Sequence, residues 1–126
     1  MGTTILGLAA VDPDVTITHT LEAKGHYRVG TRIDIPGERP VSLRVEDDLS
    51  SVAADSDVII DFTEPESSLS HFRTACLHGR AIIIGTTGIP VEALSEMRRT
   101  KDARAVISPN MSVGVNLLFS LVQKAA

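Results

Sequence analysis

Two short loops carry the residue types best suited to holding a ligand. Asp61–Thr63 (DFT) follows the apolar run Val58–Ile60, and Gly85–Gly88 (GTTG) follows the apolar run Ala81–Ile84. Short apolar runs rich in β-branched residues predict strands that are buried on both faces, as in a parallel sheet. Such sheets bind ligands at the carboxyl ends of their strands. We therefore expect the ligand site in these two loops.

A helix is predicted between these two strands. Thr63-Glu64-Pro65-Glu66 has the form of a capping box with proline in the first turn, which indicates where the helix begins. Leu69, Phe72 and Cys76 recur at helical spacing, and Gly79 stands where a C-terminal cap glycine is favoured. Strand, helix and strand within about 30 residues predict a βαβ crossover, which would be right-handed.

The segments on either side predict further strands and helices, so we expect one α/β domain over residues 1–126, built as a doubly wound parallel sheet. The predicted elements are a helix ending at Ala10, a strand Val15–Glu22, a loop 26–40, a short edge strand Val41–Val45, a brief helix capped by Asp48, a helix beginning at Pro90, a strand Ala105–Ile107, and a helix marked by Val115, Leu118, Phe119 and Val122 that continues to Ala126.

Composition excludes several classes of function. The net charge is −4 and aromatic residues make up 3% of the chain, which argues against a nucleic acid partner. No apolar run approaches the roughly 20 residues of a membrane span, and the start lacks the form of a signal peptide, so we expect a cytoplasmic protein. Cys76 is interpreted as a buried helix thiol, and the histidine spacing predicts no metal site. Asp61, Glu64 and Glu66 are interpreted as capping groups.

Three strings, VIIDFT with Pro65 two residues later, IIIGTTG and PNMSVGVNLL, occur in this order along the chain. Together they resemble the N-terminal nucleotide-binding domain of 4-hydroxy-tetrahydrodipicolinate reductase, also called dihydrodipicolinate reductase. The resemblance covers essentially the whole chain. It implies a Rossmann-like doubly wound parallel sheet, an oxidoreductase, and NADH or NADPH as the cofactor.

In that family the domain opens with a strand and a GxxGRMG turn, and a second domain carries the catalytic His and Lys residues and the homotetramer interface. Met1-Gly2 match the end of the turn, so we expect a chain truncated at both ends. The missing strand would lie between Val15–Leu21 and Val58–Phe62. The resemblance therefore implies no catalytic residue in this chain, no turnover by the chain alone, and weak dinucleotide binding.

The resemblance also implies which residues contact the cofactor and the substrate. Glu22 matches the acid that binds the adenosine ribose, although from the residues alone a solvated strand-end acid is equally favoured. Asn110 is explained better, from the residues alone, by an Asx turn. Thr87 matches a contact to the substrate carboxylate. The implied cofactor-binding residues are Glu22, Phe62, Thr63, Gly85, Thr86, Thr87, Ser108, Pro109, Asn110 and Met111.

These observations predict the nucleotide-binding part of an NAD(P)H-dependent reductase of 4-hydroxy-tetrahydrodipicolinate, in lysine and diaminopimelate biosynthesis. It would act on a small-molecule substrate and would bind neither nucleic acid nor a membrane. The alternatives are a non-catalytic nucleotide-binding module and an inactive gene fragment. Ala23 occupies a position where the family often has Arg, and Lys24 follows, so the sequence leaves NADH and NADPH open.

Overall fold

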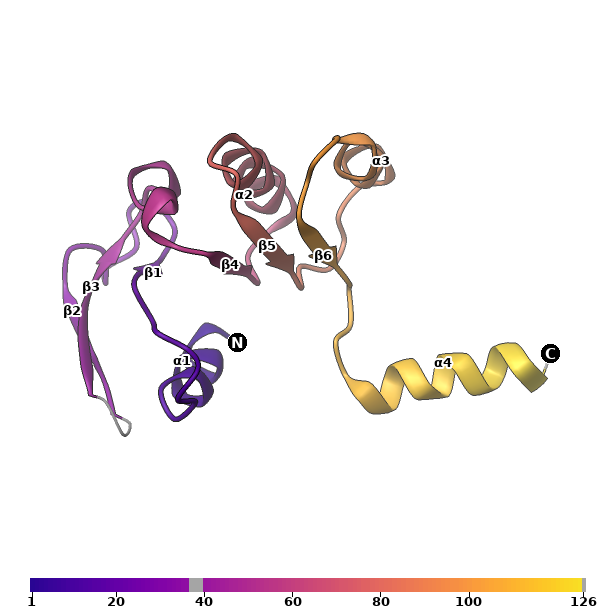
Figure 1. Ribbon diagram of the computed structural model, residues 1–126, viewed down its shortest axis with the longest axis horizontal. Coiled ribbons are helices and arrows are strands. Elements are labelled where there is room, and N and C mark those ends of the chain that lie inside the picture. The colour runs from indigo at the N-terminus through magenta and orange to yellow at the C-terminus, as the bar shows by residue number, and fades with distance from the viewer. Residues whose placement is uncertain (37–39, 126) are drawn as a thin grey trace. The chain divides into compact units, whose positions relative to one another are not determined.

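The computed structural model describes residues 1–36 and 40–125. The chain forms two compact units, Met1–Asp57 and Val58–Ala126, whose elements are labelled in Figure 1. Part of the predicted loop 26–40 and the predicted helix end at Ala126 lie outside the described residues.

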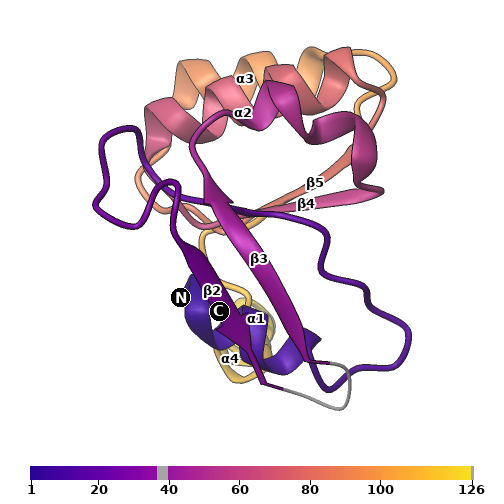
Figure 2. The same ribbon diagram turned by 90° about the vertical axis from the view of Figure 1, so that its left-hand side faces the viewer.

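The first unit contains a three-stranded sheet that follows a short helix, α1 (Gly2–Ala9). Its strands are β1 (Thr20–Leu21), β2 (Arg32–Ile35) and β3 (Val41–Glu46), in the order β1-β3-β2. β1 runs parallel to β3, and β2 runs antiparallel to β3, beside which it lies in Figure 2. Two 3-10 helices, η1 (Leu49–Ser51) and η2 (Ala53–Asp55), complete the unit.

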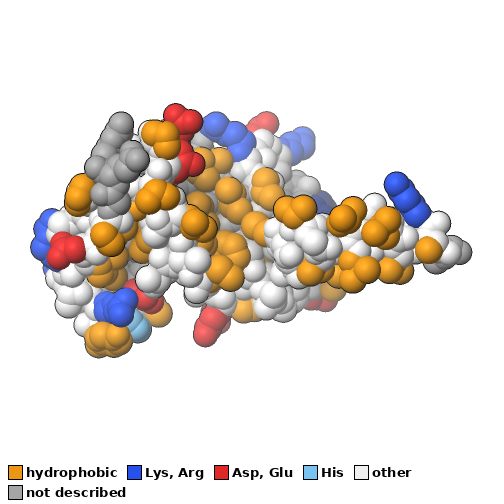
Figure 3. Space-filling view, turned by 90° about the horizontal axis from the view of Figure 1, so that it is seen from below, with side chains coloured by type: hydrophobic (Ala, Val, Ile, Leu, Met, Phe, Trp, Pro, Cys, Tyr) orange, Lys and Arg blue, Asp and Glu red, His pale blue; other side chains and the backbone are white. Residues whose placement is uncertain are grey.

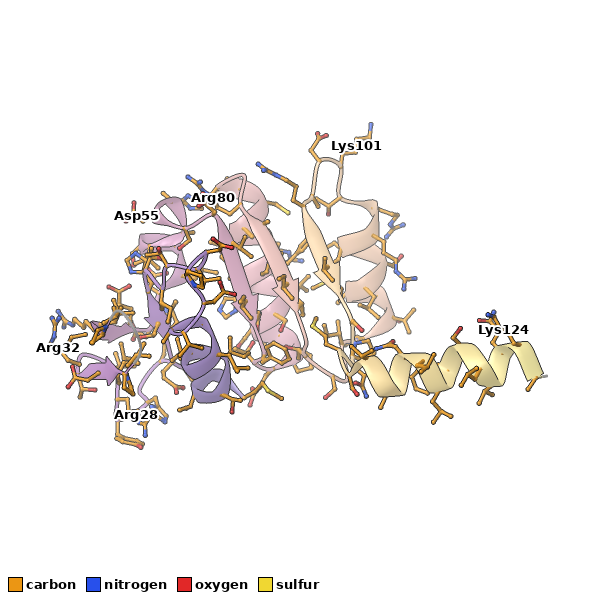
Figure 4. All side chains as sticks on the ribbon, turned by 60° about the horizontal axis from the view of Figure 1, so that its bottom comes forward. Arg28, Arg32, Asp55, Arg80, Lys101 and Lys124 are labelled. Atoms are coloured by element: carbon orange, nitrogen blue, oxygen red, sulfur yellow. The ribbon has the colours of Figure 1, made fainter. Side chains whose placement is uncertain are left out.

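The first unit differs from the sequence prediction in three respects. The strand predicted over Val15–Glu22 is confined to β1, which has two residues. Val41–Val45 was expected at an edge, but β3 is the central strand. The third difference is β2, which lies within the predicted loop. Its Arg32 side chain reaches across the hairpin and donates from Nη2 to the Ser42 carbonyl oxygen at 2.7 Å (Figure 4).

The brief helix predicted after Asp48 is confirmed in a modified form. The Asp48 carboxylate accepts a hydrogen bond from the Ser50 N–H at 2.9 Å, as an N-cap does, and two 3-10 turns follow instead of one α-helix. Leu49, Val52 and Ala53 from these turns are buried. The turns thus contribute apolar side chains to the interior of the first unit.

The second unit is a parallel sheet with crossover helices, which confirms the predicted α/β class. Strands β4 (Val58–Asp61), β5 (Ala81–Ile84) and β6 (Ala105–Ile107) pair in sequence order. Helix α2 (Pro65–Leu77) connects β4 to β5, α3 (Val91–Arg99) connects β5 to β6, and α4 (Val113–Ala125) follows β6. Among the described residues, β1 pairs only with β3 and β4 pairs only with β5.

The two ends of α2 bear out the sequence prediction unequally. Gly79 has a φ of 64°, and the N–H of Arg80 donates to the Ala75 carbonyl at 2.8 Å, so the predicted glycine cap is confirmed. The predicted capping box is wrong. The N-cap residue is Glu64, which makes no side-chain capping bond, while the Thr63 hydroxyl bonds instead to Asp61.

The core of the second unit lies between the sheet and helices α2 and α3, which cover the same face in Figures 1 and 2. The buried cluster is formed by Phe72, Ala75, Ile82, Ile84 and Met97. On the opposite face, Val58, Ile60 and Val106 are about half exposed, at 49%, 50% and 59%. Helix α4 buries none of its described residues, and hydrophobic side chains lie along it in Figure 3.

Replacing Phe72 by alanine should destabilise the second unit strongly. The ring is 1% exposed and packs in the buried cluster, so its removal should lower the free energy of unfolding by about 3–5 kcal/mol. Urea denaturation of the full chain measures this loss. The matched control is Leu77→Ala on the same helix, where the side chain is 83% exposed and the change should stay within about 0.5 kcal/mol. Equal losses in the two variants would contradict this assignment of the core.

Candidate functional site

The two predicted ligand loops begin next to each other, at the carboxyl ends of β4 and β5. Asp61 pairs with Ile84 in the parallel register of these strands. Immediately beyond, the N–H of Gly85 donates to the Asp61 carbonyl at 2.8 Å. The DFT and GTTG segments are therefore held side by side by the β4–β5 ladder itself.

Position 85 requires a glycine because the Phe62 ring lies where the Cβ atom of any other residue would be. A Cβ atom added at Gly85 would overlap this ring, with Cδ1 only 2.6 Å away. Real Cβ atoms essentially never approach another heavy atom so closely, so any larger residue would have to displace the ring. The backbone of Gly85 can thus pass directly beneath an aromatic side chain. The role of Gly85 toward a nicotinamide ring stays a prediction.

A buried carboxylate organises the polar groups beside this contact. Asp61 is 2% exposed. Its Oδ1 accepts hydrogen bonds from the Thr63 N–H at 2.9 Å and from the Thr63 hydroxyl at 2.6 Å. Its Oδ2 lies 3.0 Å from Nδ1 of His71, a residue of α2. Both oxygens of the carboxylate are therefore satisfied, and Asp61 is not the capping group that the sequence suggested.

Thr86 extends this network into the loop after β5. The Thr86 hydroxyl oxygen accepts from the Ser68 hydroxyl at 2.7 Å and from the Thr63 N–H at 3.1 Å. Ser68 is fully buried at the start of α2, and Thr86 is 6% exposed. The network consequently joins the end of β4, the start of α2 and the loop after β5.

The pKa of Asp61 is lower than the usual value for an aspartate. Burial alone would raise it, but the hydrogen bonds from His71 and Thr63 and the nearby imidazole outweigh this effect. The side chain is thus held in the carboxylate form at neutral pH. A carboxylate only accepts hydrogen bonds, so Asp61 can accept from the Thr63 N–H, the Thr63 hydroxyl and the His71 ring at the same time.

The third predicted loop follows β6 and is also tied to β5. The N–H of Ser108 donates to the Ile84 carbonyl at 3.0 Å, and the Ser108 hydroxyl donates to the Asn110 carbonyl at 2.8 Å. The Asn110 side chain closes an Asx turn by accepting from the Ser112 N–H at 2.9 Å, as the residues alone favoured. Pro109, Asn110 and Met111 are exposed.

Of the remaining predicted residues, Thr87 is exposed in the GTTG loop and Glu22 belongs to the first unit. The Glu22 N–H donates to the Glu46 carbonyl at 2.9 Å, which continues the β1–β3 ladder, and the side chain is exposed. The structure thus brings Phe62, Thr63, Gly85 and Thr86 into one contiguous group within the second unit. The cofactor and substrate roles of all the predicted residues stay predictions.

Ser68 and His71 belong to this group but were not singled out from the sequence. The available signal was a serine on the apolar stripe of α2, since Ser68, Phe72 and Ala75 recur at helical spacing and all three are buried. A serine at such a position needs a hydrogen-bond partner, and here the partner is Thr86.

Two further classes of site were searched in the described part of the chain. Residues 1–36 and 40–125 contain no group of three or more His, Cys, Asp or Glu side chains that could hold a metal ion. Within the same residues, no helix has the length and apolar character needed to cross a membrane.

Replacing Asp61 by asparagine should reduce stability at neutral pH and flatten its acid dependence. The lost charge-assisted hydrogen bonds should lower the free energy of unfolding by about 1.5–3 kcal/mol at pH 7. Because the folded-state pKa is depressed, this stabilisation is fully present above the unfolded-state pKa, near 3.8, and disappears as the pH falls through the folded value.

Urea titrations between pH 7 and pH 2.5 measure this difference. The wild-type curve should fall more steeply below about pH 4 than the Asp61→Asn curve. Glu92→Gln, at an exposed carboxylate on α3, is the control and should keep the wild-type slope. Parallel wild-type and Asp61→Asn curves would show that the carboxylate is not held as described.

The sequence matches a known family over most of its length. The profile of the family described as "Dihydrodipicolinate reductase, N-terminus" matches residues 1–111. A 4-hydroxy-tetrahydrodipicolinate reductase of Anaeromyxobacter dehalogenans (strain 2CP-1) is 37% identical over 128 residues, which cover 100% of this chain and 47% of the relative. One of Geobacter metallireducens is 39% identical, covering 100% of this chain and 48% of the relative.

A third relative, the 4-hydroxy-tetrahydrodipicolinate reductase of Anaeromyxobacter sp. (strain Fw109-5), is 40% identical over 129 residues, which cover 100% of this chain and 47% of the relative. The chain thus spans about half the length of the curated relatives that it matches. The family predicted from the three sequence strings is confirmed. The chain belongs to the family of dihydrodipicolinate reductases, of which it matches the N-terminal part.

Proposed function

We propose that this chain supplies the nucleotide-binding part of an NAD(P)H-dependent reductase of 4-hydroxy-tetrahydrodipicolinate, which acts in lysine and diaminopimelate biosynthesis. One observation carries the proposal. The DFT and GTTG loops lie side by side at the carboxyl ends of paired parallel strands, where sheets of this class bind nucleotides. The curated relatives of that name, which align with the whole chain, support the substrate assignment.

The proposal assigns a contact with the dinucleotide to each predicted residue. Glu22 in the first unit accepts hydrogen bonds from the hydroxyl groups of the adenosine ribose. Phe62 and Thr63 lie beside the adenosine half, and Gly85, Thr86 and Thr87 lie beneath the nicotinamide. Thr87 also contacts a carboxylate of the substrate.

The loop Ser108–Met111 forms the second wall on the nicotinamide side. Within it, the Asn110 carbonyl already accepts from Ser108 and Asn116, and the Asn110 Oδ1 already accepts from the Ser112 N–H. The amide N–H₂ of Asn110 is therefore the group that this side chain can offer to a bound cofactor.

The cofactor supplies the chemistry, which is the transfer of a hydride to the substrate. The chain contributes orientation, because the loops that would meet the cofactor are fixed by the β-ladder and by the Asp61 network. Its residues do not discriminate between NADH and NADPH. Glu22 suits the free ribose of NADH, whereas Lys24 offers a positive charge that suits a 2′-phosphate.

The remaining properties of the whole reductase are part of the same proposal. We infer a cytoplasmic homotetramer that acts on a small molecule and has no nucleic acid partner. The net charge of −4 and the scarcity of aromatic residues support the last point.

Replacing Glu22 by alanine should weaken dinucleotide binding by about 1–3 kcal/mol, because charge-assisted hydrogen bonds to the ribose are lost. The titration is best made with a chimera in which this chain replaces the matching 128 residues of the Anaeromyxobacter dehalogenans relative. Calorimetry with NADH and with NADPH measures the affinity. Glu92→Ala, at an exposed acid on α3, is the control and should bind as the parent does. Equal affinity of the Glu22→Ala variant would remove the ribose assignment.

The same chimera should reduce freshly prepared 4-hydroxy-tetrahydrodipicolinate, whereas the chain alone should not. We expect this because the family resemblance implies that the catalytic His and Lys residues lie in the second domain. Oxidation of NADPH at a rate proportional to protein concentration is the measurement. Turnover by the chain alone would refute this division of roles. A folded chimera that binds NADH without turnover would favour the non-catalytic module, and one that binds no dinucleotide would favour the inactive fragment.

A further inference from the structure

Three hydroxyl groups at the strand ends of the second unit form a network in which each proton can be assigned. The Thr63 hydroxyl donates to Asp61 Oδ1 at 2.6 Å. The Ser68 hydroxyl donates to the Thr86 oxygen at 2.7 Å. The Thr63 and Ser68 oxygens are 3.3 Å apart, but both of their protons are already used in shorter bonds. The Thr63 proton therefore points to Asp61 and the Ser68 proton to Thr86, and neither hydroxyl donates to the other.

Thr86 occupies the end of this network. Its oxygen accepts two hydrogen bonds, from Ser68 and from the Thr63 N–H at 3.1 Å, and a hydroxyl oxygen has two lone pairs. Its own proton has no acceptor among the residues that the structure describes. Since Thr86 is 6% exposed, this proton is a hydrogen-bond donor that is largely shielded from bulk water. A buried donor without an acceptor costs about 1–3 kcal/mol, which an oxygen of a bound ligand would recover.

His71 holds the Asp61 carboxylate, to which Thr63 donates. Its Nδ1 lies 3.0 Å from Asp61 Oδ2, and since a carboxylate only accepts, Nδ1 carries the proton. The imidazole is 28% exposed and its bond keeps Oδ2 satisfied. Without that donor, Oδ2 would lose its partner, and the carboxylate whose Oδ1 accepts from the N–H and the hydroxyl of Thr63 would be held less firmly.

We propose that Asp61 and His71 are positioning residues that hold Thr63 in place. The Thr63 N–H and the Ser68 hydroxyl then occupy both lone pairs of the Thr86 oxygen, and Thr86 presents its own proton to an oxygen of the bound dinucleotide. The inference rests on the proposed function for the identity of the ligand. It does not depend on that function for the proton directions, which follow from distances within the protein. A ligand that offered an N–H group at this point would meet a second donor and be disfavoured.

The proton directions are tested first, in the full chain without ligand. Nitrogen NMR of the His71 ring at pH 8 should show the proton on Nδ1 in the wild type and a changed tautomer in Asp61→Asn. The Thr63 and Thr86 amide signals should shift in Asp61→Asn and in His71→Gln. His78→Gln, at the other end of α2, is the matched control and should leave these signals in place. A wild-type ring protonated on Nε2, or Thr63 and Thr86 signals unmoved in Asp61→Asn, would overturn the inference.

Binding of NADH is tested second, by following the Thr63 and Thr86 signals, which report even weak affinity. Thr86→Val should weaken binding about tenfold, and Thr86→Ser, which keeps the hydroxyl, should stay within about twofold of wild type. Asp61→Asn alone should weaken binding about fivefold, and His71→Gln about threefold. Because Asp61 acts through Thr86, adding Asp61→Asn to Thr86→Val should cost less than about twofold more.

The outcomes separate the two proposals. Full additivity in the double variant, or equal binding by Thr86→Val and wild type, would overturn the positioning role, since a purely structural effect of Asp61 would not depend on Thr86. If Asp61→Asn does not fold, His71→Gln combined with Thr86→Val gives the same cycle. If NADH shifts no signal in the wild-type chain and does not bind to the chimera, while the ring proton lies on Nδ1, the cofactor assignment fails and the proton network stands.

Discussion

The buried charge of Asp61 is the constraint on which the strand ends of the second unit depend. An unpaired carboxylate at 2% exposure would cost several kcal/mol, so the surrounding chain has to supply donors. It supplies the N–H and the hydroxyl of Thr63 and the imidazole of His71. These donors come from the loop after β4 and from α2. The hydrogen bonds that satisfy this one charge therefore tie the loop after β4 and helix α2 to the end of β4.

The sequence predicted the second unit well because its signals are local. The apolar runs of β4 and β5 contain enough β-branched residues to indicate buried strands, and the length between them allows only one helical crossover. Gly79 closes α2 through a bond between residues close in sequence. The placement of DFT beside GTTG follows from the rule that parallel strands share a carboxyl edge, so the sequence was enough to predict that these two loops adjoin.

What the sequence did not predict depends on contacts that form only when the chain has folded. The strand β2 is short and alternates Arg and Asp with Ile, and its pairing with β3 decides its conformation. Thr63 fits a capping box by sequence, yet the N-cap is the next residue, Glu64, and the Thr63 hydroxyl donates to the buried Asp61 carboxylate. Ser68 and His71 acquire their roles only when α2 packs on the strand ends.

The site network lies on the covered face of the sheet, which follows from the alternation of side chains along β4. Ile59 packs against the buried cluster, so Asp61, two residues later, points to the same face as α2, while Val58 and Ile60 point to the opposite, half-exposed face. Ile82 and Ile84 in β5 follow the same alternation. All the donors to Asp61 and Thr86 come from this covered side or from the loops at its edge. The arrangement of Thr63 and Thr86 is therefore set by packing that is complete within the second unit, and it does not require the opposite face of the sheet to be covered.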